Sequence, residues 1–292
     1  RGFGDTITYR GLGNTLFFSK PSVILYIDDV AQGDVFTQSM DFGQIESIQF
    51  HRGLQASRFG QNSQAGVIEL TSAVPSNEYH GEAIAEYRSY NSYDFRLNFR
   101  GPLVKDELYI DLSTFYAERD GYMYNTTLNR RIDQKQSEGA QVRVIWKPTD
   151  VLELSFSSAA QSYDDGGHPQ TSLTATDLYE VSSNELGQTL IGSNQQTFRL
   201  KRDFDWGSFK SITSRNEWEL DPSFVDLDLT SAATSHSTII KDQTRWSHEL
   251  RVESDGRGKF NWRTGLFFSD TDTRSWAQRV FLTVVNEQTS YN

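Results

Sequence analysis

The chain has 292 residues, 36% of them hydrophobic and 13% aromatic, with a net charge of −11 and no cysteine. The acidic balance argues against a nucleic-acid partner, and the lack of cysteine excludes disulfides and thiolate metal sites. Low hydropathy combined with many aromatic residues is unlike disorder, and it suits a structure in which every second residue is buried or faces lipid.

Residues 1–76 are predicted to form a small domain of mixed α/β type. Short apolar runs at 22–30, 45–50 and 65–72 are separated by glycine-containing turns, as in buried or half-buried strands. Asp41 is a candidate N-cap, so a short helical turn is expected just before the second run.

Glycine recurs between the second and third of these strands, at Gly53, Gly60 and Gly66. Glycine lets a chain reverse in a confined space, either by adopting a positive φ or by approaching neighbouring backbone closely. We therefore expect this connection to turn within a crowded environment.

From about Tyr79 the pattern changes to strict alternation over segments of roughly ten residues. In 108–118 apolar residues share one face, while Asp111 and Ser113 lie on the other. The same pattern recurs at 140–146, 151–159, 245–254 and 261–269. About nine such segments are present, an odd number that cannot close a bacterial barrel. We therefore expect antiparallel strands of an incomplete barrel.

The connections between these segments alternate in length. Tight turns are predicted at 147–150, 205–208 and 254–259. Long polar loops are predicted at 119–136, about 164–194 and 221–242. Short turns at one end and long loops at the other are typical of an outer-membrane β-barrel. Tryptophans beside the short turns fit an aromatic girdle at the membrane interface, namely Trp146, Trp206 and Trp262.

Other classes of protein fit less well. A soluble β-sandwich or β-helix also alternates, but its strands are usually shorter and its turns more uniform. No stretch approaches the roughly 18 apolar residues of a membrane helix, and no signal peptide opens the chain. The abrupt start at Arg1 leads us to expect part of a longer protein. The five histidines lack metal-ligand spacing and no nucleophile–base pair is legible, so no metal, cofactor or catalytic site is predicted.

Several ordered blocks resemble the plug domain of TonB-dependent outer-membrane receptors and the barrel that follows it. They are Arg1-Gly2, "VILYIDDV" (23–30), "IESIQFHRGLQASRFGQNSQAGVIELTS" (45–72) and "EYHGEAIAEYRSYN" (78–91). The segment 101–125 is similar to the early barrel strands of siderophore-type members. The chain departs from the family pattern at Asp29 (Gly in the family), Gln49 (Glu), Leu54 (Pro) and Ala65 (Gly).

The resemblance implies a plug over 1–76 and, over 77–292, the first strands of a barrel of about 22 strands in the outer membrane. It implies energised uptake of a large scarce ligand, most often a ferric siderophore, driven by a TonB complex that contacts a segment upstream of this chain. Haem, cobalamin or an oligosaccharide are alternative ligands. A passive porin-like channel and a β-rich adhesin are alternative classes.

The resemblance also implies where the plug docks. Arg52, together with Glu46 and Arg1, is expected to hold the plug against the barrel. Arginine can make charge-assisted bonds to inward-facing carboxylates, for which the candidates are Asp111, Glu153, Glu249 and Glu253. The alternative for Arg52 is an ordinary surface ion pair.

Ligand contact is expected from the plug apex, in the segment 36–43. Its side chains offer the mixture of apolar and polar groups of a small-ligand pocket, namely Phe36, Gln38, Met40, Asp41 and Phe42. The alternative is that Phe36 and Phe42 pack in the core of the plug.

Overall fold

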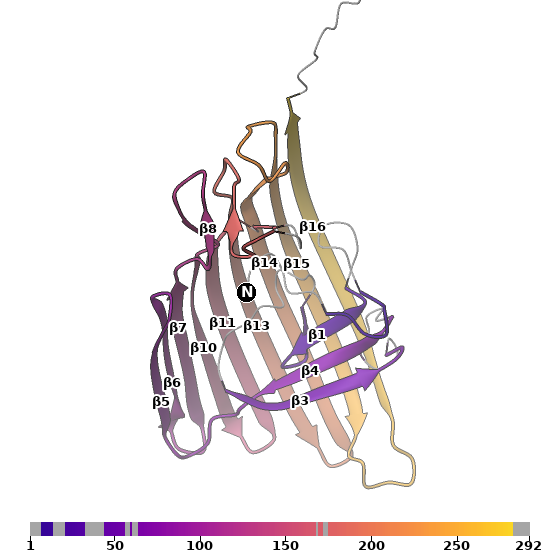
Figure 1. Cartoon of the computed structure of the whole chain (residues 1–292). Coiled ribbons are helices and arrows are strands. Elements are labelled where there is room, and N and C mark those ends of the chain that lie inside the picture. Colours follow the sequence, from indigo (N-terminus) through magenta and orange to yellow (C-terminus); the bar gives the residue numbers. More distant parts are fainter. Residues whose placement is uncertain are drawn as a thin grey trace, which may run out of the picture.

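The computed structural model describes residues 7–13, 21–32, 44–55, 59, 64–167, 169–171 and 175–282. These residues form a large one-layer sheet, a small sheet that lies against one of its faces, and a minor sheet at the end of the longer loops (Figure 1). Within the described residues, no helix is long and apolar enough to cross a membrane.

The small sheet, which we call the plug sheet, has four strands in the order β2-β1-β4-β3. They are β1 (Val23–Ile27), β2 (Val30–Ala31), β3 (Ile45–Arg52) and β4 (Gly66–Ser72). The three predicted apolar runs are thus confirmed as strands. β1 pairs with β4 in parallel and with β2 antiparallel. The first four residues of β1 are buried, which explains its uninterrupted apolar sequence.

Two glycines of the β3–β4 connection act as the sequence suggested. Gly53 follows β3 with a φ of +82°, a conformation that favours glycine. At Gly66 a Cβ atom would lie 2.7 Å from the carbonyl oxygen of His51, so only glycine permits this approach of β4 to β3. Gly60 and the helical turn expected from Asp41 lie outside the described residues.

The large sheet, which we call the wall, has nine strands in the described residues, as the alternation predicted. Every neighbouring pair in it is antiparallel. The strands are β5 (His80–Arg88), β6 (Ser92–Val104), β7 (Leu108–Arg119), β10 (Lys135–Thr149), β11 (Leu152–Gly166), β13 (Gln188–Phe204), β14 (Gly207–Asp226), β15 (Ser235–Ser254) and β16 (Arg263–Phe281).

The connections alternate between short and long, as predicted, but some bounds were wrong. A loop was expected over 221–242, yet β14 continues to Asp226 and β15 begins at Ser235. These polar residues stay in strands because the neighbouring strand satisfies their backbone, up to the pair Asp226 and His236. In the same way β11 and β13 shorten the loop expected over 164–194.

Three long loops are joined at their tips by backbone hydrogen bonds. Two of them contribute the minor sheet, in the order β12-β8-β9, formed by β8 (Met123–Asn125), β9 (Arg130–Ile132) and β12 (Glu180–Val181). The third is tied in by the amide of Asn184, which donates to the carbonyl of Thr230 over 2.9 Å. The loops therefore form one connected rim.

The two faces of the wall differ in composition, as the alternation predicted. Tyr109, Ser113 and Phe115 of β7 are buried on the face that carries the plug sheet. Large apolar side chains are exposed on the other face, including Leu112, Phe156, Phe198 and Leu250. Trp146, Trp206 and Trp262 are exposed near the short turns, and the last two stack with ring centroids 6.2 Å apart. The exposed apolar face is therefore suited to lipid.

Cysteine labelling tests which end of the wall faces outward. Thr127 lies in the loop between β8 and β9, whereas Thr149 ends β10 at the opposite, short-turn end, and both are exposed. In the full-length protein on intact cells, an impermeant maleimide is expected to label Thr127→Cys and to label Thr149→Cys only after lysis. Equal labelling of both before lysis would contradict this orientation.

Candidate functional site: the contact between plug and wall

The plug sheet meets the wall at the two-residue turn between β1 and β2. Asp28 and Asp29 form this turn with φ values of 49° and 66°. Positive φ at both central positions is the pattern of a type I′ hairpin turn, which favours Asn-Gly or Asp-Gly. Aspartate adopts a positive φ less readily than glycine, so two aspartates here are less favourable for the backbone. They place two carboxylates at the tip of the turn. We call this pair the acidic turn.

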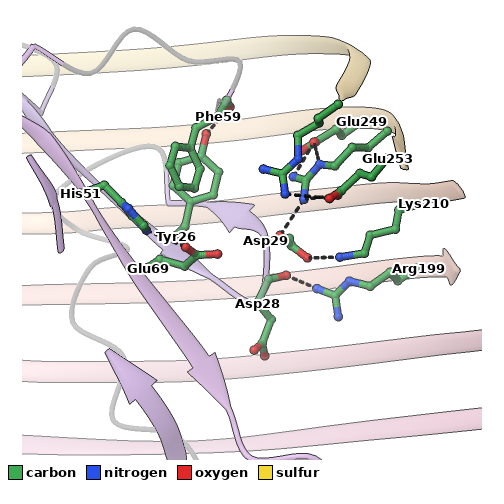
Figure 2. A network of polar contacts seen from close by, with 12 residues as sticks. Tyr26, Asp28, Asp29, His51, Phe59, Glu69, Arg199, Lys210, Glu249 and Glu253 are labelled. Carbon is green, nitrogen blue, oxygen red and sulfur yellow. Dashed lines mark hydrogen bonds and ion pairs between the residues drawn. The ribbon is translucent and has the colours of Figure 1, made fainter. Parts of the chain in front are cut away.

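Asp29 is held by two cations of the wall. Its carboxylate accepts a hydrogen bond from Arg251 over 3.1 Å and lies 3.7 Å from the ammonium of Lys210 (Figure 2). Burial alone raises the pKa of Asp29, but the charges of Lys210, Arg251 and Arg199 outweigh it, so the pKa is lowered from its ordinary value of 3.8. Asp29 is therefore ionised at neutral pH.

Asp28 fixes the turn from its other side. Its carboxylate accepts a hydrogen bond from the backbone amide of Ser72 over 2.7 Å and lies 3.5 Å from Arg143. Its backbone carbonyl accepts a hydrogen bond from the guanidinium of Arg199 (Figure 2). Both aspartates are thus bound by the wall, and Asp28 also ties the turn to the end of β4.

The wall contributes one cation from each of four strands, namely Arg143 (β10), Arg199 (β13), Lys210 (β14) and Arg251 (β15). We call these four side chains the basic arc. Wall carboxylates hold two of them in place. Arg143 bonds to Asp111 over 2.5 Å, and Arg251 bonds to Glu249 over 2.6 Å. These wall carboxylates help to orient the two guanidinium groups towards the acidic turn.

The expected inward carboxylates are therefore present, but the described docking has the opposite polarity. Acid lies on the plug and base on the wall. Arg52 and Glu46 are exposed on β3, and neither has an ion pair within the described part of the chain. Arg1 lies outside that part. Docking roles for these three residues remain predictions. The one sign of this docking role in the sequence was that Asp29 stands where the family has glycine.

The interior of the plug packs around Tyr26 and Phe59. Their rings are 4.9 Å apart, and the hydroxyl of Tyr26 donates to the carbonyl of Phe59 over 2.6 Å (Figure 2). Burial, with a contribution from Glu249, raises the pKa of Tyr26 despite the opposing charges of Arg245 and Arg251. Tyr26 thus faces both the plug core and the charged side chains of β15.

A small cavity of about 60 Å³ lies between the plug sheet and the wall. Leu25, Ile27 and Leu70 line it on the plug side, and Ser157 and Thr197 line it on the wall side. This volume holds a few water molecules, whereas pockets for drug-sized ligands measure about 300–1,000 Å³. This cavity between the described plug sheet and the wall is therefore too small for a drug-sized ligand.

The ligand contacts expected at the plug apex lie outside the described residues, and their role remains a prediction. They are Phe36, Gln38, Met40, Asp41 and Phe42. Among described residues, no group of three or more metal-ligating side chains comes together.

Docking of the acidic turn is expected to weaken in acid. Because the pKa of Asp29 is lowered by docking, its stabilisation is present above the ordinary value of 3.8 and is lost as the pH falls below it. Hydrogen exchange of the β1–β2 amides in the full-length protein should therefore accelerate relative to the plug core between pH 7 and pH 3. An Asp29→Asn variant should lack most of this difference. Equal pH dependence in both proteins would contradict it.

Comparison with known proteins agrees with this architecture. Residues 1–67 match the TonB-dependent Receptor Plug Domain. The pesticin receptor of Yersinia pestis is 30% identical over 122 residues, which cover 41% of this chain and 18% of that protein. The probable TonB-dependent siderophore receptor PirA of Acinetobacter baumannii is 26% identical over 181 residues, covering 57% and 24%.

Solved structures share the fold. The ferric yersiniabactin uptake receptor FyuA from Yersinia pestis superposes with a TM-score of 0.84 at 19% identity, covering 96% of this chain and 44% of that one. The siderophore receptor PirA from Acinetobacter baumannii superposes with a TM-score of 0.60 at 15% identity, covering 87% and 40%. The chain spans less than half the length of each of these relatives.

A mixed plug sheet, locked by ion pairs to one face of a nine-stranded antiparallel wall with a lipid-suited opposite face, defines a plugged outer-membrane barrel. The first part of the chain matches the plug domain of TonB-dependent receptors, and the described residues share the fold of solved siderophore receptors.

Proposed function

We propose that the chain forms the plug and the first wall strands of a receptor that takes up a ferric siderophore across the outer membrane. The observation that carries this proposal is the ionic lock between the acidic turn and the basic arc, beside a cavity of only about 60 Å³. A docked plug would block diffusion through a passive channel. It suits a receptor that opens its lumen only when the ligand is taken up.

The cargo is inferred from the relatives. FyuA is a ferric yersiniabactin uptake receptor, and PirA is a siderophore receptor. A ferric siderophore is too large for the cavity, so the plug must be displaced or remodelled. In this proposal, that work comes from a TonB complex acting on a segment upstream of the chain. Haem, cobalamin and oligosaccharides are the competing cargoes.

The experiment uses the full-length receptor in iron-starved cells that lack their own siderophore receptors. Radioactive iron is supplied as a panel of ferric siderophores, with haem, cobalamin and oligosaccharides as competitors. Binding to cells should persist without TonB, while accumulation should require both TonB and the proton gradient. Accumulation that continues without TonB would indicate a passive channel. Competition by haem or cobalamin alone would reassign the cargo.

A further inference from the structure

Of the three buried arginines in the described wall, Arg245 is the one without a bonding partner; Arg143 and Arg251 both have one. Arg245, in the middle of β15, is only 8% exposed, yet it makes no hydrogen bond or ion pair with any residue that the structure describes. Its Nε atom is fully buried. By contrast, Arg251 on the same strand, equally buried, bonds to Asp29 and Glu249.

Stability does not account for this arginine. Removing a guanidinium from water without a compensating partner is costly, and an apolar side chain of similar size would be better tolerated. The acid nearest along β15 on the same face is Glu249, whose carboxylate is already bonded to Arg251 over 2.6 Å. A cation retained despite this cost indicates a function that is not used while the plug is docked against the wall.

The surroundings of Arg245 on the wall are neutral and able to form hydrogen bonds. Its register partners are Asn216 on β14 and Thr271 on β16. Towards the long-loop end, Gln243 donates to Thr273 over 3.0 Å and accepts from the indole of Trp218 over 3.2 Å. A charged group of a passing solute would find hydrogen-bonding side chains here, with Arg245 as the cation among them.

The plug covers this position. Tyr26 of β1 lies near enough to Arg245 for its titration to respond to the arginine's charge, and its hydroxyl is committed to Phe59. Tyr26 is thus close enough to Arg245 to feel its charge, yet no hydrogen bond joins these two residues. If β1 moves away from the wall, Arg245 is uncovered.

We propose that Arg245 is an oxyanion-binding step on the transport route, used only while the plug is displaced. Its guanidinium then binds carboxylate or catecholate oxygens of an anionic ferric chelate, for which a planar fork of donors is suited. This inference rests on the proposed function. It adds a binding position for the ligand inside the lumen, deeper than the extracellular rim and between the rim and the basic arc.

The test separates the charge of Arg245 from transport of any particular ligand. The purified full-length receptor is placed in planar bilayers, and urea is added until the plug loosens while the barrel stays folded. The reversal potential in a potassium chloride gradient then reports ion selectivity. Arg245→Leu should shift selectivity towards potassium, and Arg245→Lys should retain the wild-type value.

Arg215→Leu is the matched control. Arg215 pairs in register with Trp246, one residue from Arg245, and lies over the Trp246 ring on the opposite face, 5.8 Å from its centroid. Its removal deletes the same charge outside the lumen and should leave selectivity unchanged. An equal shift in Arg215→Leu and Arg245→Leu would overturn the proposal.

A second measurement tests the unpartnered state. The plug of Arg245→Leu should unfold at a higher urea concentration than that of the wild type, because a buried unpaired charge is removed. A lower concentration would show that the guanidinium has a structural partner, and the proposal would fail. If the leucine variant does not assemble, Arg245→Gln serves in both measurements. Neither measurement needs TonB or a siderophore, so failure here is distinct from failure of the proposed function.

Discussion

Replacing Asp29 with asparagine is expected to weaken plug docking by about 3 kcal/mol, which is more than about a hundredfold in the docking equilibrium. The value is at the lower end of the cost of breaking a buried ion pair because the Asp29 side chain retains 24% exposure. Arg251 and Lys210 would lose a shared carboxylate. Asparagine tolerates the left-handed backbone of the turn, so the change isolates charge from backbone strain.

The measurement is entry of a large antibiotic into cells that carry the full-length receptor, together with protease sensitivity of the plug. Asp106→Asn is the matched control, because Asp106 also has a positive φ (63°) in a tight turn and has no described ion pair. Asp29→Gly adds a second comparison. Glycine relieves the backbone but removes the carboxylate, so it should leak almost as much as asparagine. Unchanged leakage in both Asp29 variants would show that the acidic turn does not hold the plug against the wall.

Arg251→Gln is expected to have the larger effect, about 3–5 kcal/mol, because Arg251 serves three carboxylates at once. It lies 3.1 Å from Asp29, 2.6 Å from Glu249 and 3.7 Å from Glu253. Without it, Asp29 keeps only the longer contact with Lys210. The plug should become protease-sensitive, and the surrounding part of β15 should exchange its amides faster.

A double-mutant cycle distinguishes loss of docking from damage to the wall. Adding Glu249→Gln to Arg251→Gln removes the neighbouring acid that was left unpaired, so part of the wall stability should return. Docking should not recover, because Asp29 still lacks its arginine. Strict additivity of the two changes would mean that Arg251 and Glu249 do not act as a pair.

The wall could be predicted from sequence because its information is local. A side-chain period of two marks each strand, and the inward position of Asp111 followed from its neighbours alone. The ends of the strands were harder to predict, since polar residues such as Ser223 and Asp226 remain in β14 because they pair with β15. The hydropathy pattern indicates only the part of each strand that lies within the membrane, whereas the strands themselves extend beyond the membrane.

The polarity of docking could not be predicted, because it depends on contacts between distant residues. Asp29 and Arg251 are separated by 222 positions. In the sequence, Asp29 stood out only as a departure from the family's glycine, and that departure does not indicate which residue pairs with it. Arg245 was overlooked for the opposite reason. Its significance lies in contacts that it does not make, and no sequence pattern records those.

The parallel pairing of β1 with β4 has a mechanical consequence. A pull on the chain before Val23 acts along the axis of β1, so the β1–β4 hydrogen bonds are loaded in shear, all together. The acidic turn lies at the far end of the same strand, so the tension also reaches its ion pairs with the wall. Water can replace those ion pairs one at a time, whereas the ladder must fail as a whole. Under load, the plug sheet should therefore leave the wall in one piece before it unravels.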